Sequence, residues 1–269
     1  MQRQTLDLIS IVIPVWNEEE GIPQLYRSLM RLRELLRKRG NLEFIFVDDG
    51  SSDNTQEKIR QQFGTGENYC IVPHGHNQGI GCAFRSGFKA ARGTIICTID
   101  ADCTYSPEGL KSLIDALDGS GSDIAVASPY HPQGKVEGVA FWRLLVSKCC
   151  SWFYRRLAPV HLYTYTSIFR AYRRHVTETV SFHGTGFVCA AEILVRAGQK
   201  GYRIVEVPMT LHSRQIGQSK MKVLRTTRAH LRMMKSLVTG AVTSNRSNSV
   251  KKAVALEFSE PVLAKRAGR

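Results

Sequence analysis

The sequence predicts an α/β fold with a mostly parallel sheet flanked by helices, and two observations indicate it. Apolar runs typical of strands alternate with segments of helical periodicity from residue 8 to residue 127, an order typical of parallel sheets with right-handed crossovers. A polar cluster follows each apolar run: WNEEE, DDGSSD, HNQGIG and DADCTYS. Because parallel strands end at one edge of their sheet, these clusters should gather where open α/β sheets bind ligands.

The strand at residues 95–99 is the clearest element of this pattern. All its residues are apolar or β-branched, as expected for a strand that helices cover on both faces. Similar runs predict four more strands in the first half of the chain, at residues 8–15, 44–47, 69–72 and 124–127.

Helices are predicted between these strands because apolar residues recur at steps of three and four. The segment 18–39 shows this period most clearly, and Gly40 should end it. The other predicted helices span residues 55–63, 79–92 and 107–117, the last with a proline in its first turn.

The alternating pattern ends after residue 128. The later predictions are an aromatic-rich amphipathic helix at 142–157, strands at 167–172 and 203–207, a helix ending at 192–198 and a basic amphipathic helix at 221–238. The residues beyond 241 are rich in Ser, Asn, Lys and Ala, a composition that predicts a basic, disordered tail at 241–269.

The charge of the chain is strongly positive and uneven. It carries 37 Lys and Arg against 23 Asp and Glu, a net charge of +14, and nearly all the excess lies in the last third. Such a region should meet a polyanionic partner, and anionic lipid, a lipid phosphate and nucleic acid all qualify.

Three features bear on the cellular compartment. The seven cysteines are an odd number without paired metal spacing, which favours a reducing compartment and buried apolar roles. The amino terminus shows no signal peptide. No apolar run reaches the ~18 residues that a membrane span requires. We therefore expect a cytoplasmic protein whose contact with a membrane is peripheral.

Asp100 and Asp102 follow the strand at 95–99 directly. Two carboxylates at positions i and i+2 of a strand end can reach one point, but their charges repel each other unless a cation lies between them. Mg²⁺ takes carboxylate oxygens together with substrate phosphate oxygens. The pair therefore predicts a metal–diphosphate site, and the alternative is an ordinary polar turn after a core strand.

Five motifs together resemble one family. They are IVIPVWNEEEGI, FVDDGSSDNT, HNQGIGCAFRSGFKAARG, IDADCTYSPE and EVPMTLHSRQIGQSKM, in the order and at the spacing of glycosyltransferase family 2. The branch that the chain resembles most is the dolichol- and polyprenyl-phosphate sugar synthases, over about residues 8–235. The resemblance implies a GT-A fold, a GDP- or UDP-sugar substrate, Mg²⁺ or Mn²⁺, and inversion at the anomeric carbon.

The resemblance also assigns residues to the nucleotide-sugar. The expected contacts are Pro14, Trp16, Asn17, Glu18, Asp48, Asp49, Gly79, Gly81, Asp100, Ala101 and Asp102. Asp100 and Asp102 would be the metal ligands, and Asp100 would also hold the sugar or ribose. Gly79 and Gly81 would allow a close approach of the backbone. For Asp48 and Asp49 an Asx turn and a helix cap are the alternative roles.

The acceptor phosphate is assigned to a second group of residues. The resemblance points to Arg143, Arg170, Arg214, Ser219 and Lys220. Arg214 and Lys220 are also expected to be catalytic, with Asp100 and Asp102, because positive charge stabilises a leaving diphosphate.

Three residues depart from the branch pattern on the acceptor side. Pro129 stands where many members have an arginine, Thr164 replaces an acid, and Ile168 replaces a glycine. The identity of the acceptor is therefore open. A phosphate acceptor needs no general base because it is already ionised near neutral pH, whereas a hydroxyl acceptor would need one, and Glu137 is the candidate.

The sequence thus predicts one catalytic domain at residues 1–240. Its nucleotide-sugar half covers about 8–127, its acceptor half 128–238, and the tail follows. The predicted partners are a nucleotide-sugar, a lipid phosphate and an anionic membrane surface, with the basic helix at 221–238 either lying on lipid or covering the sheet. A non-catalytic basic module is the remaining alternative; no nucleic-acid partner is expected.

Overall fold

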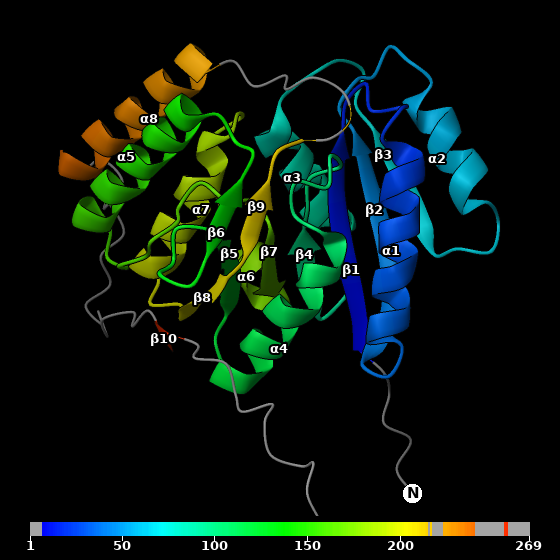
Figure 1. Cartoon of the computed structure of the whole chain (residues 1–269), viewed down its shortest axis with the longest axis horizontal. Coiled ribbons are helices and arrows are strands. Elements are labelled where there is room, and N and C mark those ends of the chain that lie inside the picture. Colours follow the sequence, from blue (N-terminus) through cyan, green and yellow to red (C-terminus); the bar gives the residue numbers. More distant parts are fainter. Residues whose placement is uncertain (1–6, 215, 217–222, 240–255, 258–269) are drawn as a thin grey trace, which may run out of the picture.

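The computed structural model describes residues 7–214, 216, 223–239 and 256–257, and in it an eight-stranded sheet lies between two layers of helices (Figure 1). The strand order is β10-β8-β5-β7-β4-β1-β2-β3, and β7 alone runs antiparallel to its neighbours. The strands of this sheet are β1 (Asp7–Val15), β2 (Gly40–Asp48), β3 (Tyr69–Pro73), β4 (Ile95–Thr98), β5 (Ile124–Ser128), β7 (Arg170–Arg173), β8 (Ile204–Pro208) and β10 (Leu256–Glu257). The prediction of a mostly parallel α/β sheet is confirmed.

The helices divide between the two faces of the sheet, and each group closes its own apolar core. One face is covered by α1 (Ile22–Leu36), α2 (Thr55–Phe63) and α4 (Leu110–Ser120), which a 3₁₀ turn (Pro107–Gly109) precedes. The other is covered by α3 (Ile80–Ala90), α5 (Phe141–Leu157), α6 (Arg174–Thr179), α7 (Val188–Gln199) and α8 (Val223–Val238).

The side-chain alternation of β1 explains why both cores form. Ile9, Ile11 and Ile13 belong to the core beneath α1, whereas Val12 points into the core beneath α3. Successive side chains of a strand point to opposite faces, so a strand buried on both faces must be apolar at nearly every position. The unbroken apolar runs of the sequence are the consequence.

Several predicted boundaries need correction. The first helix begins at Ile22 and not at Glu18, because the Glu18 carbonyl accepts hydrogen bonds from the N–H groups of Gly21 and Ile22 in a turn. The predicted strand at 167–172 is β7, which is shorter and inserts antiparallel between β4 and β5. Four elements were not predicted: α6, the edge strand β10, and a small parallel pair formed by β6 (Lys135–Glu137) and β9 (Thr210–His212).

Most of the predicted disordered tail lies outside the described residues. The part that the structure describes, β10, adds a strand to the sheet, with Leu256 opposite Val205 and Glu257 opposite Glu206.

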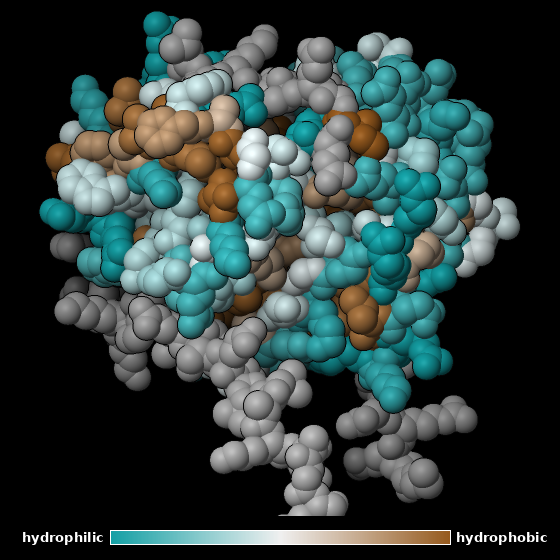
Figure 2. Space-filling model, in the orientation of Figure 1, coloured by the Kyte–Doolittle hydropathy of each residue, from teal (hydrophilic) through white to brown (hydrophobic). Residues whose placement is uncertain are grey.

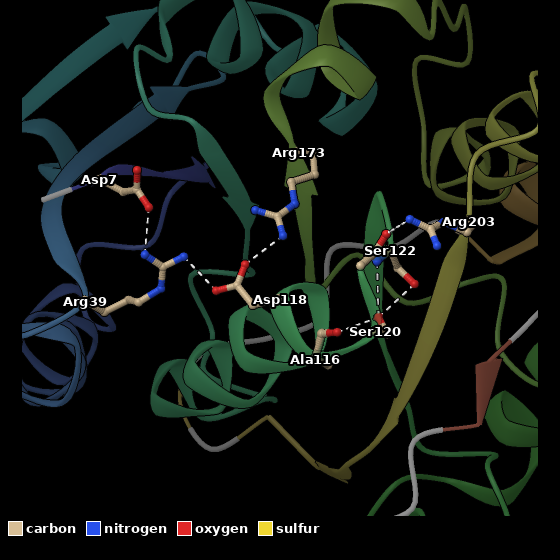
Figure 3. A network of polar contacts seen from close by, with 9 residues as sticks. Asp7, Arg39, Ala116, Asp118, Ser120, Ser122, Arg173 and Arg203 are labelled. Atoms are coloured by element: carbon tan, nitrogen blue, oxygen red, sulfur yellow. Dashed lines mark hydrogen bonds and ion pairs between the residues drawn. The ribbon is translucent and has the colours of Figure 1, made fainter. Parts of the chain in front are cut away.

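An ion-pair network holds the edge of the sheet where the parallel strands begin (Figure 3). Arg39 donates hydrogen bonds to Asp7 at 2.7 Å and to Asp118 at 2.6 Å, and Arg173 donates to Asp118 at 2.7 Å. The network joins the start of β1, the residues after α1, the end of α4 and the end of β7. The polar clusters after the strands lie at the opposite edge of the sheet and take no part in this network.

Strand register brings three of those clusters together. Val15 of β1 lies opposite Asp48 of β2, and Val12 lies opposite Thr98 of β4. The loops that follow β1, β2 and β4 therefore leave the sheet side by side, as the sequence predicted.

Candidate active site

The loops after β1 and β2 are joined by hydrogen bonds between backbone and side chains. The Asn17 N–H donates to Ser51 Oγ at 2.9 Å, and the Ser52 N–H donates to Asn17 Oδ1 at 2.7 Å. The Glu18 N–H donates to Thr55 Oγ1 at 2.8 Å. Asn17 has a φ of 52°, a left-handed conformation that asparagine tolerates better than most residues. The predicted contacts Asn17 and Glu18 are thus fixed relative to α2, while Pro14 and Trp16 are half-buried beside them.

Asp48 and Asp49 are buried and have partners within the loops. Asp48 accepts hydrogen bonds from the Ser51 N–H at 3.0 Å and from the Gln56 side chain, the geometry of an Asx turn. Asp49 accepts from the N–H groups of Gln78 at 2.9 Å and Gly79 at 2.8 Å. Both carboxylates thus organise the loops, Asp48 within its own turn and Asp49 towards the start of α3, and their contact with a nucleotide-sugar stays a prediction.

Gly79 and Gly81 allow a close approach, but the approaching backbone belongs to the chain itself. A Cβ on Gly79, whose φ is +94°, would lie 2.4 Å from the Thr185 carbonyl oxygen. A Cβ on Gly81 would lie 1.9 Å from the Gly184 carbonyl oxygen, and the Gly81 N–H donates to the Thr185 carbonyl at 2.8 Å. The glycines therefore let the loop before α7 pack on the start of α3.

Three carboxylates and one guanidinium meet beyond the end of β4. Arg214, which follows β9, donates to Glu18 Oε2, and its Nη1 lies 3.9 Å from Asp102 Oδ2. Asp102 also accepts from the Thr104 N–H at 3.1 Å. The structure thus brings together the predicted residues Glu18, Asp100, Asp102 and Arg214 from three separate segments.

The charge balance of this cluster is unfavourable for Asp100. Its burial raises the pKa of the Asp100 carboxyl well above its usual range, and the neighbouring charges of Asp102 and Glu18 raise it further, while Arg214 opposes the change. One guanidinium does not compensate three carboxylates in a buried position. Such a cluster favours an additional cation.

The residues present fit a divalent cation only with help from a substrate. Within the described part of the chain, no three His, Cys, Asp or Glu residues are arranged to hold a metal ion by themselves. Mg²⁺ and Mn²⁺ accept oxygen ligands, and Mg²⁺ commonly takes one or two carboxylates with substrate phosphates. Asp100 and Asp102 match that arrangement and are the residues that would hold such an ion.

A cavity of about 690 Å³ opens from Asp100 and Asp102 towards α5 and α8. Arg214 and Arg143 contribute positive charge to its wall, and Tyr130, Leu144, Val146 and Leu211 are among its apolar lining residues. The volume is within the range of small-molecule sites, which combine an apolar wall with a few polar groups.

The three departures from the family pattern all line this cavity. Pro129, Thr164 and Ile168 lie on its wall. Thr164 is held from two sides: its Oγ1 is 2.8 Å from Ser128 Oγ, and its N–H donates to Glu206 at 2.9 Å. Sequence reasoning missed Glu206, although an acid inside the apolar strand IVEVP was a usable signal.

The predicted acceptor residues separate in the structure. Arg143 lines the cavity. Arg170 is absent from its wall: the side chain is fully buried and donates to the Tyr165 carbonyl at 3.0 Å, and its role toward an acceptor phosphate stays a prediction. Ser219 and Lys220 lie outside the described residues.

Two histidines of the cavity wall were not predicted. His212 lies 3.2 Å from Glu137, the candidate base for a hydroxyl acceptor. His230 of α8 is buried, and its Nδ1 is 2.9 Å from the Tyr154 hydroxyl. Burial lowers the pKa of His230 to about 4. His212 lies within the motif EVPMTLHSRQIGQSKM and His230 within the predicted basic helix, but only the tertiary structure shows that both face one cavity.

Comparison with known proteins identifies the family. The family model "Glycosyl transferase family 2" matches residues 10–181. A dolichol-phosphate mannosyltransferase of Pyrococcus furiosus is 35% identical over 216 residues, which cover 80% of this chain and 59% of that protein. A polyprenol monophosphomannose synthase of Mycolicibacterium smegmatis is 32% identical over 218 residues, which cover 78% of this chain and 80% of that protein. The chain belongs to glycosyltransferase family 2.

Solved structures agree with the GT-A fold expected for a family 2 member. Glucosyl-3-phosphoglycerate synthase from Mycobacterium tuberculosis, in complex with Mn²⁺, UDP and glucosyl-3-phosphoglycerate, has a TM-score of 0.64 at 19% identity, over 90% of this chain and 82% of that one. A mannosyltransferase from Pyrobaculum calidifontis, in complex with GDP-Man and Mn²⁺, has a TM-score of 0.61 at 17% identity, over 91% of this chain and 66% of that one. The fold prediction is thereby confirmed.

The chain spans about three fifths of the length of the archaeal relative that it matches. Among the described helices of this family 2 chain, none is both long and apolar enough to cross a bilayer.

Proposed function

We propose that this chain transfers a sugar, with inversion, from a nucleotide-sugar to a polyprenyl phosphate. One observation carries the proposal: the carboxylate pair Asp100 and Asp102 shares a cavity with Arg143 and Arg214, and an apolar wall connects them. The carboxylates suit the metal–diphosphate end of a nucleotide-sugar. Arg143 and the apolar wall suit a phosphate attached to a hydrocarbon chain. The names of the two relatives support the same acceptor class.

The residues around Asp102 would stabilise the leaving nucleoside diphosphate. Negative charge grows on the nucleoside diphosphate as the bond to the sugar breaks, and a positioned cation stabilises it. Arg214 is the described side chain in place for this role, because it already lies beside Glu18 and Asp102. Mg²⁺ or Mn²⁺, held by Asp100 and Asp102, would neutralise the same diphosphate.

The wall of the cavity also favours a phosphate nucleophile. Its described acidic residues are Asp100 and Asp102 alone, and both are assigned to the diphosphate side. A phosphate monoester has a second pKa of about 6 and attacks without a general base. Arg143 would bind and orient this group on the α5 side.

A hydroxyl acceptor is the second candidate, and the Glu137–His212 contact is the observation that favours it. Glu137 is not on the cavity wall, but His212 is, and the two are 3.2 Å apart. A carboxylate that orients a histidine can make it a general base. His212→Ala should abolish transfer to a hydroxyl and leave transfer to a phosphate nearly unchanged.

The donor that we propose first is GDP-mannose, with UDP-glucose as the comparison. Both curated relatives bear mannose in their names, and one solved structure holds GDP-Man with Mn²⁺. We place the reaction at the cytoplasmic face of a membrane, with the protein bound peripherally through the basic helix α8; nucleic acid is not a proposed partner.

A screen of GDP- and UDP-sugars against a short-chain isoprenyl phosphate tests the proposal. Release of nucleoside diphosphate should require both the acceptor and Mn²⁺ or Mg²⁺. Release that is equally fast without any isoprenyl phosphate would contradict the acceptor assignment.

A further inference from the structure

The helix α5 exposes a continuous apolar stripe along its outer side. Phe141 is 78% exposed, Trp142 51%, Leu145 51%, Trp152 52% and Phe153 47%. These positions recur at the spacing of one helix face, and Leu157 extends the stripe by a further turn. Isolated exposed apolar residues are ordinary, but several large ones gathered on one side of a helix indicate an interaction site.

The stripe is not the side of α5 that packs on the protein. Cys150, Ser151 and Tyr154 are the buried residues of the helix, and they face the core and α8. A helix that covers a globular core normally has one apolar face and one polar face. α5 is apolar on both sides, so its outer side is suited to a non-aqueous environment.

The charge around the stripe has a single sign. Neither α5 nor α8 contains an acidic residue, whereas each carries four cations. On α5, Arg143 lies over the Trp142 ring at 5.4 Å and Arg156 lies over the Trp152 ring at 4.7 Å. The cations therefore lie against the exposed rings, where they can meet anionic groups at the same depth.

The helix α8 continues this surface. It packs beside α5, and its exposed residues include Leu231 at 58% and Val238 at 71%, next to the exposed Arg228, Arg232 and Lys235. Figure 1 shows the two helices side by side at one end of the molecule, and Figure 2 shows hydrophobic residues gathered there. Met234 of the same helix is buried, so α8 both covers the core and presents apolar side chains outward.

We propose that the outer sides of α5 and α8, here called the α5–α8 face, insert into the headgroup region of an anionic bilayer. Aromatic rings beside cations are typical of membrane interfaces, where one end of a side chain is apolar and the other wet. Basic helices with an apolar face lie in the plane of that interface. Charge complementarity selects the occupant: eight cations without one acid fit anionic lipid.

The role of the α5–α8 face in delivering a lipid acceptor to the cavity rests on the proposed function. Trp142 is both exposed on the stripe and part of the cavity wall, and Arg143 follows it in that wall. A bilayer bound to the α5–α8 face would therefore meet the rim of the cavity. A lipid phosphate could then enter beside Arg143 while its hydrocarbon chain stays in the membrane.

The test is binding of the full chain to vesicles of phosphatidylcholine with and without phosphatidylglycerol. The variant carries Trp152→Ser and Phe153→Ser, two exposed residues that do not line the cavity. Its control is Leu35→Ser on α1, where the side chain is 51% exposed, close to the 52% of Trp152 and the 47% of Phe153. We expect the double variant to lose at least about tenfold in affinity for anionic vesicles, because two apolar side chains no longer leave water, and the control to bind like wild type.

Depth of insertion provides a second readout. Brominated acyl chains should quench the fluorescence of the wild type and quench Trp152→Ser less. Equal vesicle binding by the double variant and wild type would overturn the proposal, as would absence of wild-type binding to anionic vesicles. A dimer that the double variant dissociates, without vesicle binding, would assign the face to a second copy and overturn it too.

Transfer to a water-soluble short-chain isoprenyl phosphate separates this inference from the proposed function. The double variant should match wild type with that acceptor and fall behind only when a long-chain acceptor is embedded in vesicles. Vesicle binding without any transfer would refute the proposed function but support the α5–α8 face as a membrane-binding surface. Transfer without vesicle binding would support the proposed function but refute the membrane-binding surface.

Discussion

Arg214 forms an ion pair with Glu18, although 196 residues separate them in the sequence. Both side chains are largely buried, and the guanidinium also lies 3.9 Å from Asp102. The pair joins the loop after β9 to the loop after β1, across the end of β4. The residue expected to stabilise the leaving diphosphate is thus held among the carboxylates by contacts within the chain itself.

Replacing Arg214 should therefore affect turnover more than binding of the nucleotide-sugar. We expect Arg214→Ala to lower kcat on the order of 10²-fold, because the charge that it stabilises develops in the transition state. Arg214→Lys, which keeps the charge but not the paired geometry, should recover part of the loss. Steady-state kinetics over a range of nucleotide-sugar concentrations measure this. An unchanged kcat with a raised KM would make Arg214 a ground-state binder only.

Removal of the metal should have the same consequence as removal of Asp102. We expect Asp102→Ala and Asp102→Asn to abolish transfer because they remove an expected metal ligand. A chelator should abolish transfer in the wild type because two carboxylates without a cation repel the diphosphate. The effect of chelator should reverse on addition of Mn²⁺. Calorimetric titration of Mn²⁺ with the nucleoside diphosphate present supplies a readout independent of activity. Full activity of Asp102→Ala in excess chelator would refute metal dependence.

His230 should make the fold less stable as the pH falls. Its pKa is lowered by burial to about 4, below the ~6.5 of a histidine in the unfolded chain. Below pH 6.5 the unfolded state binds a proton that the folded state does not, so stability is complete above that pH and is lost down to about pH 4. The loss attributable to His230 is about 2 kcal/mol at pH 5.

Urea denaturation at pH 7.5, 6 and 5 measures that loss. His230→Gln should be less stable than wild type at pH 7.5, because it disturbs the contact with Tyr154, but its stability should fall less steeply with pH. Parallel pH dependences for the two proteins would show that His230 is protonated in the fold.

A methyl group at Gly81 should lower the stability of the fold. A Cβ there would lie 1.9 Å from the Gly184 carbonyl oxygen, a backbone atom that cannot turn aside. We expect Gly81→Ala to destabilise the fold by about 1–3 kcal/mol or more. Gly75→Ala is the control, since nothing lies within 4 Å of its Cβ position. Thermal unfolding of the two variants compares them, and equal melting temperatures would contradict the expected contact.

The elements that the sequence predicted well are those that local pattern determines. The strand at 95–99 and the helix at 55–63 are apolar at the positions that their periodicity requires, and the structure contains both within a residue of the predicted ends. The gathering of Glu18, Asp48 and Asp102 at one edge follows from parallel topology alone. Each of these conclusions needs only the period of the side chains and the direction of the strands.

Contacts between distant segments could not be predicted from local pattern. Arg170 was expected at the acceptor phosphate, yet β7 carries it into the core between β4 and β5. Gly81 was expected to approach a ligand, but the approaching group is the loop before α7. The outer side of α5 gave no distinct signal, because apolar residues surround the helix and periodicity cannot tell which of them are covered.

The central claim is that the cavity between Asp102 and Arg143 joins a nucleotide-sugar to a polyprenyl phosphate. The most direct test incubates the chain with radiolabelled GDP-mannose, Mn²⁺ and vesicles containing a long-chain polyprenyl phosphate, and measures label in the extracted lipid together with the GDP released. The account predicts equal molar amounts of lipid-bound mannose and GDP, both lost in Asp102→Ala. GDP release without labelled lipid, or labelled lipid that Asp102→Ala still produces, would contradict it.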